Sequence, residues 1–158
     1  MEQKSLSNWL KYMIIGTGIC GLVIAAVVVS FGLDLRQTYP ELAHCFRPWL
    51  IFLCGVGIPC YVVLSLAWRI ATNIAFDRSF SEENAKMLLK ISCLAAADTG
   101  FFFLGNLILL LLGMNHPGIV LASLVIVFIG VAISVAFAAL SHLVKKAAAL
   151  QEQSDWTI

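Results

Sequence analysis

Residues 12–33 read YMIIGTGICGLVIAAVVVSFGL, a stretch without one charged side chain. A helix of about 20 such residues crosses the core of a lipid bilayer. Three further apolar runs follow, at residues 48–68, 91–114 and 117–144. Only helices and closed barrels satisfy their backbone hydrogen bonds in lipid, and these runs lack the alternating polarity of barrel strands. The sequence therefore predicts an all-α integral membrane protein, a bundle of four transmembrane helices.

The composition supports the same class. Hydrophobic residues make up 61% and charged residues 12% of the 158 residues, whereas a soluble protein has about 25% charged residues. A net charge of +1 gives no field that would attract nucleic acid, so no direct binding of nucleic acid is expected. The length predicts a single membrane domain over residues 1–158. The first run is longer than the apolar core of a signal peptide, about 7–15 residues, and we expect it to be retained.

The positive charges predict the orientation. Eight lysines and arginines fall on the side of the two termini, and two fall on the other side. The eight are Lys4, Lys11, Arg69, Arg78, Lys86, Lys90, Lys145 and Lys146, and the two are Arg36 and Arg47. Because cytoplasmic loops carry the excess of Lys and Arg, we expect both termini in the cytoplasm.

Small residues recur at every fourth position in the last and the first run. They are Gly130, Ser134 and Ala138, and Thr17, Gly21 and Ala25. This spacing lets helix backbones approach closely. Contact within one bundle is the favoured interpretation, and the seam of a homodimer is the alternative.

Polar side chains in the two predicted outer loops form a candidate metal or pH-sensing cluster. They are Asp34, Glu41, His44, Cys45, Asn115 and His116. Their spacing matches no metal-ligand motif, so ordinary solvated loop residues are the favoured interpretation, and no metal or cofactor is expected.

The connection at residues 69–90 is predicted to be a helical cytoplasmic elbow between the second and third spans. Ser81 is placed as the N-cap of a new helix, with Glu82 and Glu83 in the first turn, where the helix dipole favours carboxylates. Asn84 stands where a capping box has Glu or Gln, so that motif is partial. The elbow is either a plain connector or a docking surface.

The stretch Phe80-Ser81-Glu82-Glu83-Asn84, followed by Leu88 to Ile91 and a hydrophobic span, resembles the YoaS-like family of bacterial four-span membrane proteins, domain of unknown function 2975. The resemblance implies a protein of the bacterial cytoplasmic (inner) membrane without an assigned activity. It also implies a partner, since relatives are often encoded beside small helix-turn-helix regulators. A membrane protein that holds such a regulator at its cytoplasmic face would fit this pairing.

Asp98 is the one acidic residue inside the four runs. It is placed about 7 Å to the cytoplasmic side of the middle of its run. A carboxylate at such depth costs about 2.5–3.5 kcal/mol, so it should face the bundle interior. Counting residues from the middle of each run predicts a polar layer around it, with Thr17, Tyr61, Ser65 and Ser134.

Two roles of Asp98 stay open. It either binds the helices together through hydrogen bonds, with Ser134 or Tyr61 as the partner of a neutral carboxyl, or it carries protons, as intramembrane carboxylates do in pumps and transporters. Asn106 is expected to make a separate interhelical contact.

Two functions follow from these features. The leading one is a non-enzymatic regulator or adaptor that contacts a cytoplasmic partner through residues 69–90, and the alternative is a small proton- or ion-coupled transporter that uses Asp98. An enzyme is not expected, because the chain has no HExxH motif, nucleophile elbow or phosphate loop. No catalytic residue is assigned.

Overall fold

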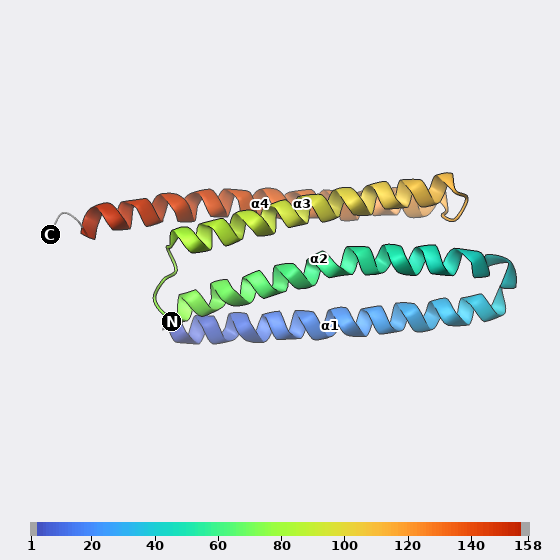
Figure 1. The fold of residues 1–158 in the computed structure, drawn as a ribbon, viewed down its shortest axis with the longest axis horizontal. Coiled ribbons are helices and arrows are strands. Elements are labelled where there is room, and N and C mark those ends of the chain that lie inside the picture. The colour runs from blue at the N-terminus through green and yellow to red at the C-terminus, as the bar shows by residue number, and fades with distance from the viewer. Residues whose placement is uncertain (1–2, 156–158) are drawn as a thin grey trace.

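A computed structural model describes residues 3–155, which are helical apart from short connections. In chain order the elements are α1 (Gln3–Thr38), the 3-10 helix η1 (Pro40–Leu42), α2 (Ala43–Ala75), α3 (Glu82–Leu111) and α4 (Pro117–Asp155). Figure 1 shows that α1 begins and α4 ends at the same end of the molecule. We call this the terminal end, and the end with η1 and the turn at residues 112–116 the opposite end.

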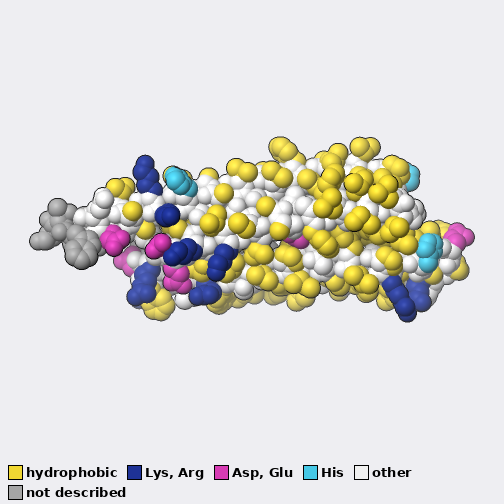
Figure 2. Space-filling model, turned by 45° about the horizontal axis from the view of Figure 1, so that its top comes forward, with side chains coloured by type: hydrophobic (Ala, Val, Ile, Leu, Met, Phe, Trp, Pro, Cys, Tyr) yellow, Lys and Arg dark blue, Asp and Glu magenta, His cyan; other side chains and the backbone are white. Residues whose placement is uncertain are grey.

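Within residues 3–155, four helices are long and apolar enough to cross a membrane, as the sequence predicts. Each predicted run lies inside one helix, except that α3 ends at Leu111 and the last residues of the third run form a turn. Figure 2 shows apolar side chains along the middle of the molecule and most of the visible Lys and Arg near the terminal end.

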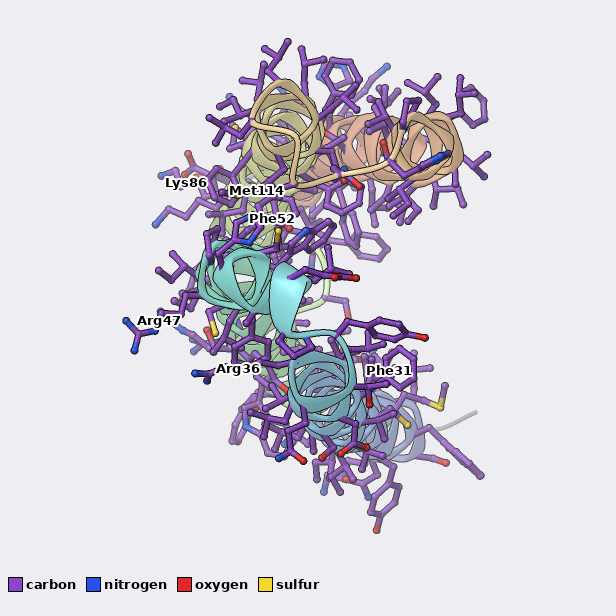
Figure 3. All side chains as sticks on the ribbon, turned by 90° about the vertical axis from the view of Figure 1, so that its right-hand side faces the viewer. Phe31, Arg36, Arg47, Phe52, Lys86 and Met114 are labelled. Carbon is purple, nitrogen blue, oxygen red and sulfur yellow. The ribbon has the colours of Figure 1, made fainter. Side chains whose placement is uncertain are left out.

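The helices pack in chain order. Within residues 3–155, the backbones of α1 and α2, of α2 and α3, and of α3 and α4 lie close together, while the backbone of α4 lies close to neither α1 nor α2. Figure 3, seen from the opposite end, shows α1, α2 and α3 in a row with α4 beside α3. The bundle is therefore open: two helical hairpins, α1–α2 and α3–α4, are joined through α2 and α3.

The α3–α4 hairpin is held by small and hydroxyl side chains. Ser92 Oγ donates to the Ser134 carbonyl at 2.8 Å, and Ser134 Oγ donates to the Ser92 carbonyl at 2.9 Å. Ser141 Oγ donates to the Ala85 carbonyl at 2.7 Å. Gly130 lies directly against the side chain of Thr99. Gly130 and Ser134 thus make the contact inside one bundle that their spacing predicts.

The α1–α2 hairpin is more loosely packed. Ser7 is the one buried residue of α1, and its Oγ donates to the Ala71 carbonyl at 2.6 Å. Tyr61 donates to the Gly18 carbonyl at 3.0 Å. The Lys11 ammonium lies 5.3 Å from the ring centre of Trp68, a cation–π contact.

An aromatic cluster joins the two hairpins near the opposite end. The ring of Phe52 on α2 lies 5.8 Å from that of Phe101 and 5.9 Å from that of Phe102, both on α3. Trp49 Nε1 donates to the Met114 carbonyl at 2.9 Å. Figure 3 shows Phe52 between α2 and α3. This apolar contact fixes the junction of the hairpins at that end.

Candidate functional site

Helix α2 stops at the terminal end in a Schellman motif. The Arg78 N–H donates to the Asn73 carbonyl at 3.0 Å, and the Asp77 N–H donates to the Ile74 carbonyl at 3.2 Å. Asp77 has a φ of 60°, the left-handed conformation in which such helix ends turn. The chain therefore leaves α2 sharply and enters the non-helical connection at residues 76–81.

Asn84 organises that connection from inside. Its side chain is fully buried, at 0% exposure. The amide nitrogen donates to the carbonyls of Arg78 at 2.9 Å and Ser79 at 3.1 Å, and the amide oxygen accepts from Asn73 Nδ2 at 2.8 Å. The connection is thereby tied to both helices that it joins.

The predicted N-cap is confirmed, but the rest of the capping motif differs. Ser81 Oγ accepts a hydrogen bond from the Asn84 N–H at 3.2 Å. The Asn84 side chain turns toward the connection instead of back to the cap. Being buried, Asn84 is removed from the predicted partner-contact surface, which leaves Phe80, Ser81, Glu82 and Glu83 as its candidate members.

Two exposed ion pairs flank the start of α3. Lys86 lies 3.1 Å from Glu82, and Arg69 on α2 lies 3.3 Å from Glu83. All four side chains are more than half exposed, so each pair contributes little, about 0–1 kcal/mol. Their role is to set the charge pattern of the surface.

A groove of mixed polar and apolar lining lies at the terminal end between the connection and the last turns of α4. Its volume is about 390 Å³. It is lined by Asp77, Arg78, Phe80, Ser81, Glu82, Lys145, Ala148, Ala149, Gln151 and Glu152. We call it the terminal groove. Phe80 is 58% exposed at its wall, whereas Phe76, 73% exposed, does not line it. An exposed aromatic ring beside charges of both signs is suited to binding a protein surface.

Asp98 faces α2 rather than a ring of hydroxyls. The Cys60 thiol donates to Asp98 Oδ2 at 3.8 Å. Asp98 Oδ1 is shielded from solvent and has no hydrogen-bond partner among the described residues. One carboxylate oxygen of the third span is therefore unpaired.

The predicted polar layer around Asp98 is not assembled. Tyr61 donates to Gly18, and Ser134 pairs with Ser92. Thr17 and Ser65 donate to carbonyls of their own helices, those of Met13 and Val62. Each of the four hydroxyls thus has another acceptor.

The reason for this difference is the register of the helices. Ser92 lies six residues before Asp98, about 9 Å nearer the terminal end, and Ser134 lies beside Ser92. Counting from the middle of each run assumes that the middles of all four helices lie at the same depth in the membrane. In the structure, the turn at residues 112–116 sets the position of α4 along α3 instead. Cys60, which is not among the four residues predicted for the polar layer, is the side chain that reaches Asp98.

The opposite end is closed by a second pair of asparagines. Asn106 is 1% exposed and donates to the Phe102 carbonyl at 2.9 Å, and Asn115 Nδ2 donates to Asn106 Oδ1 at 3.1 Å. The expected interhelical contact of Asn106 is therefore wrong, because its partner lies in the turn after its own helix.

The candidate outer-loop cluster does not come together as one group. Cys45 Sγ lies 3.3 Å from His44 Nε2. In the described part of the chain no group of three or more His, Cys, Asp or Glu side chains is placed to hold a metal ion. An apolar cavity of about 620 Å³ lies nearby, with Trp49 and His116 among its lining residues.

Comparison with known proteins places the chain among proteins without an assigned role. The family described as "Protein of unknown function (DUF2975)" matches residues 30–158. The uncharacterized membrane protein YoaS of Bacillus subtilis (strain 168) is 28% identical over 150 residues, which cover 92% of each chain. No solved structure matches.

Proposed function

The chain belongs to the DUF2975 family of proteins of unknown function, and from this premise we propose that it is a non-enzymatic regulator or adaptor of the bacterial cytoplasmic membrane. In this proposal its terminal end holds a soluble protein. The observation that carries the proposal is the terminal groove, which is lined by charged and apolar side chains and whose wall is built on a connection fixed by buried Asn84.

The charge distribution supports a cytoplasmic terminal end. Eight of the ten lysines and arginines lie in the segments that meet there, and the positive-inside rule places such segments in the cytoplasm. A soluble partner would therefore meet the terminal groove in the compartment that also holds transcription regulators.

The chemistry of the groove indicates how a partner would bind. Phe80 offers an exposed apolar anchor, and interface energy is often concentrated in such aromatic residues. Arg78 and Lys145 provide positive charge in the lining, and Asp77, Glu82 and Glu152 provide negative charge. Mixed charges around an anchor favour one orientation of a partner over others. A small helix-turn-helix regulator is the partner that the family resemblance implies.

Phe80 offers a direct test, because Phe76 is a matched control. Both rings are exposed on the same connection, but only Phe80 lines the groove. A regulator encoded in the gene neighbourhood is co-expressed with the protein and co-purified. We expect Phe80→Ala to reduce the amount of co-purified regulator by about tenfold or more, as for a hot-spot residue. Phe76→Ala should retain it. Equal retention by both variants would contradict the proposal.

Reporter fusions test the orientation separately. A fluorescent protein fused behind α4 should fluoresce, and alkaline phosphatase fused there should stay inactive. Alkaline phosphatase inserted in the turn at residues 112–116 should be active. The reverse pattern would place the terminal groove outside the cell and remove the proposed partner.

A proton- or ion-coupled transporter is the second candidate. The observation that favours it is Asp98, whose Oδ1 is shielded from solvent and unpaired among the described residues of an apolar helix. Ion flux into proteoliposomes, measured for the wild type and Asp98→Asn, tests it. Equal flux in both would exclude transport through Asp98.

A further inference from the structure

We infer that Asp98 is a proton-binding site at the junction of the two hairpins, occupied by a proton rather than by a metal cation. The inference deepens the second candidate function by naming the ion. It also holds if that ion is never carried across the membrane.

The position of Asp98 requires neutralisation. The residue lies in the middle part of α3 and faces α2, with one carboxyl oxygen near Cys60 Sγ and the other shielded and unpaired among the described residues. The four apolar runs hold no Lys or Arg, and their one histidine, His142, lies near the end of its run. An ionised carboxylate in an apolar membrane segment is costly without a counter-charge. The neutral acid avoids this cost.

The surroundings favour a proton over a metal ion. Hard cations such as Mg²⁺ and Ca²⁺ take six or more oxygen ligands, about 2.0–2.6 Å away. The side chain of α2 that donates to Asp98 is the Cys60 thiol, a soft group that does not suit these ions. Tyr61, the neighbour of Cys60 in α2, is engaged with the Gly18 carbonyl on α1. In the part of the chain that the structure describes, no group of three or more His, Cys, Asp or Glu side chains surrounds Asp98 to hold a metal ion. One proton is enough to make the carboxylate neutral.

The location gives the proton a structural effect. Within the described residues, the closest backbone approach between the two hairpins is that of α2 and α3. Cys60 and Asp98 lie on this junction, between the aromatic cluster at one end and the Asn73–Asn84 bond at the other. The ionised form needs water around the carboxylate, so loss of the proton loosens the contact between the hairpins.

Infrared spectroscopy of the full chain in lipid nanodiscs tests the inference. The difference spectrum of wild type minus Asp98→Asn at pH 7 should contain the C=O band of one protonated carboxylic acid. The band should persist at high NaCl or KCl and disappear only at alkaline pH. Asp34→Asn, at an exposed position near the opposite end, should remove no such band.

The cysteines supply a second readout that also covers poor folding of Asp98→Asn. Cys60→Ala should shift the carboxyl band to higher frequency, because the thiol no longer donates to Asp98. Cys54→Ala, at an exposed position of the same helix, should leave the band in place. A folded wild type without the band at pH 7, or a band that salt removes at constant pH, would overturn the inference. The infrared band reports whether Asp98 holds a proton, and the flux measurement reports whether an ion crosses the membrane. Absence of flux with the band present would therefore contradict transport but not proton binding.

Discussion

Helices α2 and α3 end in the same way at opposite ends of the molecule, yet the chain does different things after each stop. Both ends are Schellman motifs, with Asp77 at φ 60° after α2 and Gly113 at φ 71° after α3. Each is reinforced by a pair of asparagine side chains, Asn73 with Asn84 and Asn106 with Asn115. The two helices therefore end with the same backbone motif and with the same kind of side-chain support.

The difference lies in what each connection joins. The turn at residues 112–116 links α3 and α4, which already hold each other through Ser92, Ser134 and Ser141. The connection at residues 76–81 links two hairpins that meet less closely, and Asn84 holds its backbone from a fully buried position. A connection between loosely joined hairpins therefore needs side-chain hydrogen bonds of its own to hold its backbone. That support also fixes the wall of the terminal groove.

The largest expected effect is from Asn84→Ala. It removes three side-chain hydrogen bonds and leaves the half-buried Asn73 amide and two carbonyls without this partner. An unsatisfied buried polar group costs about 1–3 kcal/mol, so the free energy of unfolding should fall by about 2 kcal/mol or more in a denaturant titration in mixed micelles. Asn115→Ala, at a half-buried position, should cost less. A larger loss for Asn115→Ala would reverse the comparison.

The two left-handed residues should respond with opposite signs. Gly113→Ala places a Cβ in the left-handed conformation and should cost about 1–2 kcal/mol of unfolding free energy, although no neighbouring atom lies within 4 Å of that Cβ. Asp77→Gly relieves the same conformation and should be neutral or stabilising, by less than about 1 kcal/mol. The same unfolding titration measures both. If both variants were destabilised by a similar amount, the two helix ends would not be equivalent in their left-handed residues.

The smallest expected effect is from the hydrogen bonds between Ser92 of α3 and Ser134 of α4, which hold these helices together independently of the turn at residues 112–116. Ser134→Ala removes buried hydrogen bonds to Ser92, and interhelical bonds in membranes contribute about 0.6 kcal/mol each. We expect a loss of about 1 kcal/mol, which should not add to that of Ser92→Ala in a double-mutant cycle. Ser65→Ala is the control, since Ser65 donates within its own helix, and should change little. Full additivity in the cycle would mean that the two serines do not act as a pair.

The sequence alone predicts most of the helical architecture. Uncharged runs locate the four helices, because the bilayer leaves few alternatives for such segments. Ser81 is identified as an N-cap from its place before two glutamates, and Gly130 and Ser134 are identified as contact residues from their spacing. These are local or periodic signals, which a single sequence carries.

The sites are less predictable, because they depend on register. Asp98 is found from its charge, but its neighbour Cys60 follows only from how α2 slides along α3. Asn84 resembles a weak capping residue, and its burial depends on the course of residues 76–81 around it. Ala85, Ser92 and Thr99, which contact α4, recur at every seventh residue of α3, a spacing that the four-residue spacing of small residues does not include. The absence of close backbone packing between α4 and the α1–α2 hairpin is not indicated by any spacing of residues in the sequence.

Site-specific photocrosslinking at both ends of the molecule tests the central claim most directly. A photoreactive amino acid is placed at Phe80 in the terminal groove or at Leu42, 54% exposed at the opposite end, and irradiated in living cells. We expect a discrete adduct with a cytoplasmic protein at Phe80, identified by mass spectrometry as the helix-turn-helix regulator, and none at Leu42. No adduct at Phe80, or the same adduct at both positions, would contradict the central claim.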